Sequence, residues 1–395
     1  MTLKSNAESR KLMLYSLFGR GIMSIGMNYS GIYAAEIIGL GAGEFGISSA
    51  LSTIATQLTQ PLWGYISDLK GVRKYFIALG EIIFGITTAL VFTLKTFQQY
   101  MLSSIIIWVF WSGAFVCWQA LMGDLTTKDH RGRTIGIIEF AGIGGALIAN
   151  IIVGPLIDVH GYGIATITTI IFTLLAVIPV LIIHEEGDIL DENKVKYRFS
   201  WKIDATNEYK KYLILSTLWW GVMSISWPIF SLTQVKIFCL TKTEVAILSI
   251  TGSIGQMIMM PLWGNIADKF GRRNLLVISC MLTSIWPLAY AVSQNYIQLL
   301  VLNTIGSALG SSINIIPGIY LLDTIPLKEN RATLVSIYNT ITGGAQAIGQ
   351  YIGGEIASNN GLRETMMLSA ILRIMFAIPM FTLPETLTKS SKKVE

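Results

Sequence analysis

The chain has 395 residues, of which 13% are charged and 52% hydrophobic, and its mean hydropathy is +0.57. Typical soluble domains carry roughly 25% charged residues, and a water-facing surface needs about that much to stay dispersed. The composition therefore excludes a set of soluble domains, a disordered chain and a nucleic-acid-binding domain. It favours an all-α membrane protein, whose solvent is mostly lipid.

Cysteine and histidine positions predict neither a disulfide framework nor a metal site. Cys117, Cys239 and Cys280 lie in apolar runs without CxxC spacing. The three histidines stand far apart at the ends of apolar segments. We therefore expect no bound metal and no cofactor.

Twelve apolar runs are long enough to cross the hydrocarbon core, which takes about 20 residues. They lie at roughly 11–38, 45–67, 75–94, 100–122, 134–157, 162–184, 210–235, 244–266, 274–293, 297–322, 333–356 and 364–384. The stretch 185–209 is polar and charged. We predict twelve transmembrane helices in two pseudo-symmetric bundles: an N-terminal six-helix bundle at 1–184, a cytoplasmic linker at 185–209, and a C-terminal six-helix bundle with a short tail at 210–395.

Lysine and arginine mark one side of the predicted membrane protein. Most of the 29 lie in the N-terminal segment, in alternate loops, in the linker and in the tail. By the positive-inside rule these segments face the cytoplasm, so we expect a multi-pass protein of the cell membrane with both termini cytoplasmic. The net positive charge thus reflects topology, and no nucleic-acid partner is implied.

The chain also contains an internal repeat. The run PLWGYISDLKGVR at 61–73 recurs 200 residues later as PLWGNIADKFGRR at 261–273. A second match, at an offset of 199, relates Asp124 to Asp323 and the Gly-Gly-Ala run at 144–146 to that at 343–345. Repeated halves with a site between them are how many secondary transporters are built.

These repeated runs carry a family resemblance. The pattern G-x-I-x-D-x-x-G-x-R at 64–73 resembles the loop 2–3 signature of the major facilitator superfamily, and its copy resembles the loop 8–9 signature. The run DLTTKDHRGR at 124–133 resembles the family's loop 4–5 pattern, and Pro-Glu-Thr at 384–386 resembles the PET after helix twelve of sugar and organic-ion porters. The resemblance covers essentially the whole chain.

Some positions depart from the patterns of known subfamilies. Drug–proton antiporters of the family usually carry an arginine in the middle of helix four, and the run 100–122 has none. Asn150 and Asp158 stand where the antiporter pattern of helix five has glycines. The sugar-porter pattern after helix six is replaced by HEEGD at 184–188. The subfamily therefore stays open.

The resemblance implies a cytoplasmic latch. In the family, the aspartates of loops 2–3 and 8–9 lean on helices eleven and five, where a carboxylate interacts with a positive helix N-terminus. We expect these residues and their basic neighbours to hold the cytoplasmic side closed in the outward-open state; alternatively, the arginines are only positive-inside anchors. The predicted gating residues are Asp68, Gly71, Arg73, Asp268, Gly271, Arg272 and Arg273.

The family's helices one, four, seven and ten line its central cavity. In the corresponding runs, aromatic side chains recur at helical spacing together with neutral hydrogen-bonding groups. Such groups suit a sugar, a nucleoside-like molecule or an amphipathic aromatic compound; the alternative is that the rings face lipid or only pack. The candidate substrate-binding residues are Tyr29, Tyr33, Trp111, Trp118, Gln119, Trp220, Trp227, Asn303, Ser307 and Asn314. Which face of the first run lines the cavity stays open.

Ionisable residues inside membrane spans are functional candidates. Arg20 lies near the middle of its span, Glu36 nearer the outer end, and Glu139 about two turns from the cytoplasmic end of its own. We predict that these three take part in coupling or in recognising substrate charge. For Glu81 and Arg373 we expect structural roles, by pairing or by snorkelling.

The sequence thus predicts a secondary active transporter that moves a small organic solute by rocker-switch alternating access, coupled to protons. The alternatives are an ion-independent facilitator of sugars or organic solutes and a multidrug efflux antiporter; a lipid flippase ranks below them. An enzyme is not expected, because the sequence shows no nucleophile–base arrangement. We expect a monomer in the lipid bilayer, since two halves already form the pathway. The substrate, its direction and the coupling ion stay open.

Overall fold

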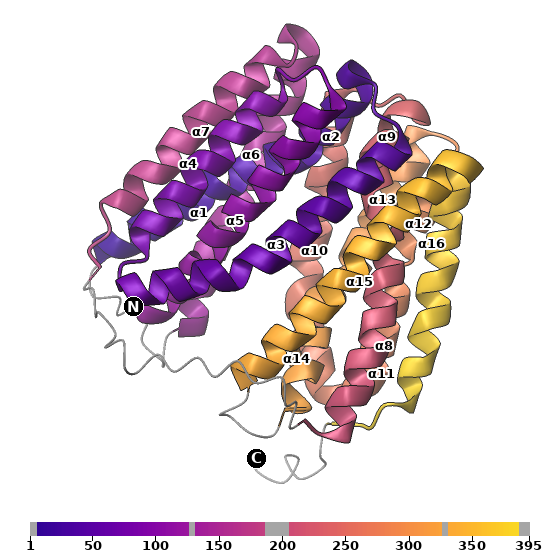
Figure 1. Cartoon of the computed structure of the whole chain (residues 1–395). Coiled ribbons are helices and arrows are strands. Elements are labelled where there is room, and N and C mark those ends of the chain that lie inside the picture. The colour runs from indigo at the N-terminus through magenta and orange to yellow at the C-terminus, as the bar shows by residue number, and fades with distance from the viewer. Residues whose placement is uncertain (1–5, 126–130, 186–204, 326–330, 387–395) are drawn as a thin grey trace. The chain divides into compact units, whose positions relative to one another are not determined.

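The computed structural model describes residues 6–125, 131–185, 205–325 and 331–386, and every regular element within these ranges is helical (Figure 1). The contacts divide the chain into two compact units. Unit 1 comprises Met1–Glu44, Leu51–Tyr197 and Gln234–Ile250, and unit 2 comprises Phe45–Ala50, Arg198–Thr233 and Thr251–Glu395. Each unit therefore takes a short segment from the other half of the sequence. The predicted division into bundles at 1–184 and 210–395 stays a prediction.

The first half of the chain forms long helices with short connections. Its elements are α1 (Asn6–Ile25), the π-helical η1 (Gly26–Ser30), α2 (Gly31–Tyr33), the π-helical η2 (Ala34–Ile38), α3 (Ala42–Lys70), α4 (Lys74–Val91), α5 (Phe97–Leu125), α6 (Arg131–His160) and α7 (Gly163–Leu181).

The second half also consists of helices, several of which are divided into shorter segments. Its elements are α8 (Asn207–Met223), η3 (Ser224–Ile229), α9 (Phe230–Lys236), α10 (Lys242–Phe270), α11 (Arg272–Leu282), α12 (Ile285–Val292), α13 (Tyr296–Gly310), η4 (Ser311–Asn314), α14 (Ile316–Asp323), α15 (Arg331–Asn360), α16 (Leu362–Ala377) and η6 (Ile378–Thr382).

Within the described ranges, nine helical stretches are long and apolar enough to cross a membrane. The protein is therefore an all-helical, multi-pass membrane protein, as the sequence predicts. The predicted spans 11–38, 45–67 and 333–356 are helical as well, in α1–η2, α3 and α15, but are not among the nine. The exact number of twelve spans stays a prediction.

Glycines bring pairs of helices into backbone contact in both halves. In unit 1, α1 packs against α6 so closely that a Cβ added to Gly145 would lie 1.7 Å from the carbonyl oxygen of Leu17. In unit 2, α15 meets α8 and η3, and a Cβ added to Gly349 would lie 1.9 Å from the carbonyl oxygen of Gly221. Small residues allow this approach in lipid, where dispersion contacts hold helices together.

A second repeated feature is a lysine that binds a carbonyl group at the C-terminal end of the last helix in each half. The Lys11 ammonium donates to the carbonyl oxygen of Ile182 at 2.8 Å, just after α7. The Lys211 ammonium, 200 residues later, donates to the carbonyl oxygen of Thr382 at 2.6 Å, at the end of η6. The carbonyls at a helix C-terminus lack partners within the helix and carry partial negative charge, which a lysine neutralises.

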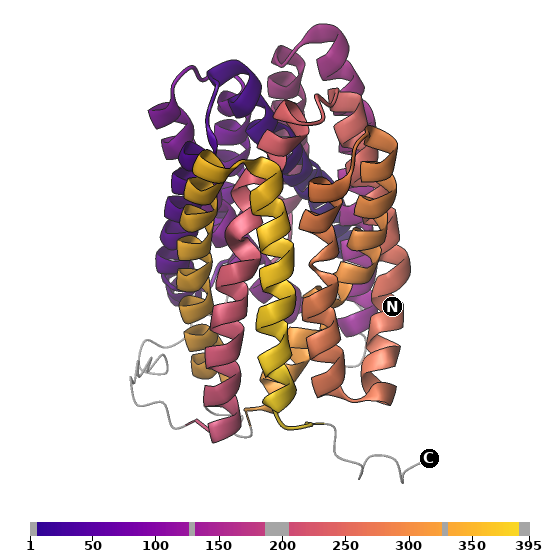
Figure 2. The same cartoon turned by 90° about the vertical axis from the view of Figure 1, so that its right-hand side faces the viewer.

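Arg373 of α16 supports two helix breaks in unit 2, where α16 lies beside α8 (Figure 2). Its fully buried guanidinium donates to the carbonyl oxygens of Thr283, between α11 and α12, and Met223, at the end of α8, both at 2.6 Å. It also donates to Ser226 Oγ at 2.7 Å. Carbonyls freed by a broken helix need such a donor in a membrane. Arg373 thus binds backbone, and neither acid pairing nor snorkelling describes it.

The glycine contact of α1 and α6 gives a prediction. Gly145→Ala should lower the free energy of unfolding by about 1–3 kcal/mol, because the added methyl group overlaps the Leu17 carbonyl. The matched control is Gly144→Ala, since a Cβ there meets nothing within 4 Å and alanine favours helix. Thermal unfolding of the two purified variants in the same detergent measures the difference, and equal midpoints would contradict it.

Candidate functional site

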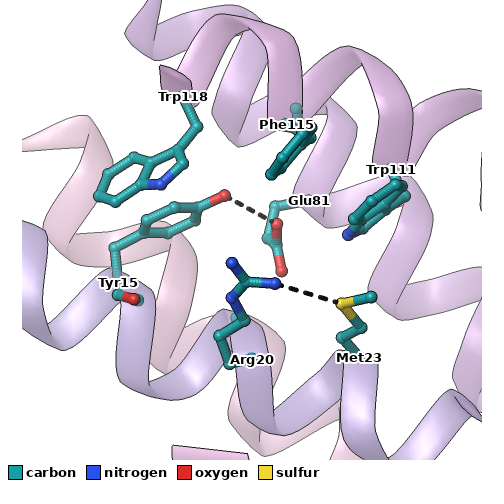
Figure 3. Close-up of a pocket in the computed structure, with 10 residues that line it drawn as sticks. Tyr15, Arg20, Met23, Glu81, Trp111, Phe115 and Trp118 are labelled. Carbon is teal, nitrogen blue, oxygen red and sulfur yellow. Dashed lines mark hydrogen bonds between the residues drawn. The ribbon is translucent and has the colours of Figure 1, made fainter. Parts of the chain in front are cut away.

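Helices α1, α4 and α5 of unit 1 line a hollow that is partly open to solvent and has a cavity volume of about 30 Å³. Figure 3 shows Trp111, Phe115 and Trp118 along α5, facing Tyr15, Arg20 and Met23 of α1, with Glu81 of α4 between them. The hollow is lined by Tyr15, Ser16, Gly19, Arg20, Met23, Glu81, Trp111, Ala114, Phe115 and Trp118.

The wall of aromatic rings follows from helical spacing. Trp111, Phe115 and Trp118 recur at four and three residues, so they share one face of α5. The rings of Trp111 and Phe115 are stacked, with centroids 5.0 Å apart. Trp118 lies against Tyr15 of α1 at 4.5 Å between centroids. The hollow can therefore bind a flat apolar or cationic group through ring faces.

Glu81 of α4 places a carboxylate beside these aromatic rings. The residue is 3% exposed, and its Oε2 accepts a hydrogen bond from the Tyr15 hydroxyl at 3.1 Å. Its Oε1 has no hydrogen-bond partner in the part of the chain that the structure describes. Gly19 leaves room for this oxygen, because a Cβ at Gly19 would lie 3.3 Å from it. A buried carboxylate with one unsatisfied oxygen is costly, which makes Glu81 a candidate functional residue.

Arg20 is paired with an acid on a different helix. Its Nη2 lies 2.8 Å from Glu139 Oε2 of α6, and about a third of each side chain is exposed. Its Nη1 also contacts the Met23 sulfur at 3.8 Å. The lining of the hollow carries one cation, Arg20, and one carboxylate, Glu81; when Glu139, the partner of Arg20 outside the lining, is included, the three groups have one carboxylate more than cations. The structure thus brings together two of the three predicted coupling residues and adds Glu81.

The third predicted coupling residue, Glu36, lies elsewhere. Its carboxylate accepts a hydrogen bond from the Tyr162 hydroxyl at 2.7 Å and pairs with the Lys242 ammonium at 2.8 Å. Tyr162 lies between the end of α6 and the start of α7, and Lys242 is the first residue of α10. Glu36 is therefore placed to join helix ends, at a distance along α1–η2 from Arg20.

The predicted substrate-binding residues of unit 1 separate into two groups. Trp111 and Trp118 line the hollow. Tyr29 and Tyr33 are buried in packing, with the Tyr33 hydroxyl donating to the Leu94 carbonyl at 2.8 Å. Gln119 is exposed on α5, outside the hollow. Gly19 and Arg20 of the first run both line the hollow, and which face of that run lines the central cavity stays open.

The remaining substrate candidates lie in unit 2. Trp220 donates from Nε1 to the Tyr338 hydroxyl at 3.2 Å, and Ser307 accepts from Trp286 Nε1 at 3.0 Å. Trp227 meets the Trp220 ring edge-on at 6.4 Å between centroids. Asn303 lies on α13 and Asn314 is exposed in η4. Their binding role stays a prediction.

The predicted gating residues form ion pairs within each unit. Arg73 Nη1 lies 3.0 Å from Asp68 Oδ1 in unit 1, and Arg272 pairs with Asp323 in unit 2. Gly71 and Gly271 take the left-handed φ values of +64° and +90° that end or precede a helix there. Asp268 falls within α10, but its side chain lies outside the described part of the structure.

Two glutamates 200 residues apart cap the helices that follow these loops. Glu185 accepts from the backbone N–H groups of Arg73, at 2.7 Å, and Lys74, at 3.0 Å, at the start of α4. Glu385 accepts from the backbone N–H groups of Arg272, at 2.7 Å, and Arg273, at 3.3 Å, at the start of α11. Carboxylates at helix N-termini satisfy free N–H groups and the helix dipole. Glu185, from the HEEGD run, thus caps a helix in the first half as Glu385, from the Pro-Glu-Thr run, does in the second.

The comparison with known families decides the class of protein. A sequence model described as Major Facilitator Superfamily matches residues 12–223 and 212–395. The chain belongs to the Major Facilitator Superfamily. Proteins of this superfamily are transporters and not enzymes, as the sequence predicts, and the two matches follow the two halves of the internal repeat.

Relatives and solved structures of the superfamily cover most of the chain. The Multi-drug resistance efflux pump PmrA homolog of Lactococcus lactis subsp. lactis (strain IL1403) is 23% identical over 348 residues, 84% of this chain and 82% of the relative. A crystal structure of a variant of the nucleoside transporter NupG has a TM-score of 0.77 at 16% identity, covering 95% and 99% of the two chains. A D-xylose-proton symporter has a TM-score of 0.73 at 13% identity, covering 96% and 98%. At these identities the solved structures show the fold alone.

The departures from the superfamily's helix-five glycine pattern have a structural reason here. Asp158 accepts from the backbone N–H groups of Lys242, at 2.9 Å, and Thr243, at 2.8 Å, and so caps α10. Asn150 accepts from Asn28 Nδ2 at 2.8 Å, within a polar cluster between α6 and η1. Gly154 keeps α6 and α10 close, because a Cβ there would lie 2.7 Å from the Lys242 carbonyl oxygen. Polar contacts thus replace two glycines.

The two glutamate caps give a prediction. Glu185→Ala and Glu385→Ala should each lower the free energy of unfolding by about 0.5–2 kcal/mol, the usual cost of a lost N-terminal cap. The conservative variants Glu185→Gln and Glu385→Gln keep an acceptor oxygen and should lose less. Thermal unfolding in one detergent compares the four variants, and equal midpoints for alanine and glutamine would contradict capping.

Proposed function

We propose that this protein is a proton-coupled secondary transporter of a small organic solute. Membership of a superfamily of transporters supports the transport of a solute, and the repeated halves support rocker-switch alternating access. The hollow of unit 1 is the proposed solute site, with Trp111 and Trp118 as its walls. The protein needs no cofactor for this work and is proposed to act as a monomer in the cell membrane, with both termini in the cytoplasm.

The observation that carries the coupling is the Glu81 carboxylate. Arg20 and Glu139 neutralise each other at 2.8 Å, whereas no cation forms an ion pair with Glu81 within the described residues. A buried carboxylate without an ion pair is stabilised by taking up a proton or by meeting a cation. Glu81 can therefore bind a proton in one half of the cycle and release it when the solute or the solvent reaches it in the other.

The gating residues keep the role that the superfamily resemblance implies. We propose that Asp68, Arg73, Arg272 and the side chain of Asp268 stabilise the state whose cytoplasmic side is closed. Asp323 and the two glutamate caps extend this set, because they hold Arg272 and the starts of α4 and α11 in place. The caps would keep these helix ends rigid as the halves move.

A multidrug efflux antiporter is the second candidate. The name of the Lactococcus lactis relative and the wall of aromatic rings favour it. Such an antiporter would expel the solute against an inward flow of protons, with Glu81 serving both. An ion-independent facilitator is the outcome if a pH gradient has no effect on transport.

Transport by Glu81→Gln tests the proposal. In proteoliposomes, the wild-type protein should carry at least one of ethidium, uridine and xylose faster under a pH gradient than without one. Glu81→Gln should reduce the ratio of the two rates to about one, because an amide does not exchange a proton. Glu355→Gln, an acid of α15 outside the hollow, is the control and should keep the wild-type ratio.

Two results would contradict the coupling role. If the wild-type rates are equal with and without the gradient, the protein is a facilitator. If Glu81→Gln retains the wild-type ratio, the proton uses another group. Transport of none of the three solutes would leave the superfamily membership intact but would remove the proposed solute classes.

A further inference from the structure

A second hollow adjoins the first within unit 1. It is partly open to solvent, has a cavity volume of about 80 Å³, and shares Met23 and Trp111 with the hollow that holds Glu81. The shared side chains separate the two hollows and form a wall of both. Beyond that wall, η1 contributes Met27 and Ser30, and α5 contributes Ser104 and Trp108.

The two hollows differ in chemistry. The first holds Arg20 and Glu81, whereas none of the described side chains that line the second is charged. The second is walled by methionine, aromatic and aliphatic groups, with hydroxyl groups of Ser30 and Ser104 among them. A ligand spanning both would need one charged end and one mostly apolar end.

Aromatic rings run without interruption from one hollow to the other. Trp111 stacks on Phe115 at 5.0 Å, on the side of Glu81, and meets Trp108 edge-on at 5.4 Å, on the side of the second hollow. A stacked or edge-on ring can pack against an apolar chain on either side. Trp111 therefore serves as a common contact for the two ends of one ligand.

The walls of the second hollow can adjust to ligands of different shape. Met27 is 58% exposed, and methionine side chains are flexible and polarisable, which suits variable apolar groups. The helix at this point changes from α1 to the π-helical η1, Gly26–Ser30. Such interruptions concentrate at functional sites.

We propose that the two hollows form one bipartite site for an amphipathic organic cation. The cationic head lies against Glu81 and the ring faces of Trp111 and Trp118, and the apolar tail fills the second hollow beyond Trp111. The inference rests on the proposed transport function and names its substrate class. The sign of the charge is inferred from the ion pairs around the first hollow: Arg20 of the lining pairs with Glu139 outside it, whereas the Glu81 carboxylate forms no ion pair within the described residues.

The length of the second hollow limits the tail. Met23 and Ser30 are seven residues apart on α1 and η1, which corresponds to about 10 Å along a helix. A tail of roughly eight carbons spans this distance. Longer chains would extend past the hydroxyl groups of Ser30 and Ser104, so each further methylene group would add less binding affinity.

Binding of n-alkyltrimethylammonium ions tests the bipartite site. Full-length protein in lipid nanodiscs is titrated with the butyl to decyl members, below their micelle concentrations, and tryptophan fluorescence is corrected with empty nanodiscs. The affinity should rise up to about fourfold for each added methylene group, the value for about 0.8 kcal/mol per buried methylene, and level off near eight carbons. A flat profile from butyl to decyl would overturn the inference.

Two variants separate the hollows. Ser104→Trp places a large ring in the second hollow and should remove the gain with chain length, while Ser103→Trp, the neighbouring residue outside the hollow, should keep it. Glu81→Gln should weaken all members by a similar factor and keep the slope. If Ser104→Trp does not fold, Ile107→Ala replaces it; by enlarging the hollow it should move the plateau to longer chains.

The charge of the head is tested with n-alkyl sulfates of the same lengths. These anions should bind at least tenfold more weakly than the cations, and Glu81→Gln should narrow this difference. Equal binding of anions and cations would overturn the proposed class. Because binding is measured at equilibrium without a pH gradient, a failure of proton coupling would leave these results unchanged, so the two proposals fail separately.

Discussion

The cost of an unpaired charge or backbone group in hydrocarbon governs this protein more than any other interaction. Several charged side chains of the described residues satisfy backbone groups that would otherwise carry this cost. Arg373 binds the carbonyl groups that the breaks of α8 and α11 set free, Lys11 and Lys211 close the last helices of the two halves, and Asp158 closes the start of α10. Glu81 Oε1 is one of several buried side-chain atoms of the described residues without a hydrogen-bond partner, and it belongs to a carboxylate in an aromatic hollow. That position makes Glu81 the centre of the proposed function.

The internal repeat places similar contacts in both halves of the chain. Gly145 and Gly349 bring equivalent helix pairs into backbone contact, and Glu185 and Glu385 cap equivalent helices. The two halves nevertheless differ where function is proposed. The first half holds Arg20, Glu81 and an uninterrupted α4, whereas the second half has broken helices around Arg373. A duplicated scaffold can thus keep its helix contacts while one copy acquires the charged hollow.

The charges of the hollow connect coupling with specificity. Arg20 and Glu139 are 119 residues apart in the sequence, lie on different helices and neutralise each other. The net charge of the site therefore depends on Glu81. Protonation of Glu81 and binding of a cation satisfy the same carboxylate, and the two events therefore exclude each other at that atom. The apolar second hollow adds affinity without adding charge, and it would let one carboxylate serve substrates that share little beyond a cationic head and an apolar tail.

The sequence by itself determined the class of protein, because hydropathy, loop charge and the repeat are local properties that a single chain displays. It also singled out Arg20, Glu139, Trp111 and Trp118 as candidates, since charges and rings in apolar runs are conspicuous, and their roles stay predictions. Only the tertiary structure decided that Arg20 meets Glu139 and that Glu81 belongs beside Tyr15. It also placed Tyr29 and Tyr33 in packing, outside the hollow. Helical spacing gives the face of one helix, but which faces of three helices meet depends on glycine contacts and on partners more than 60 residues away.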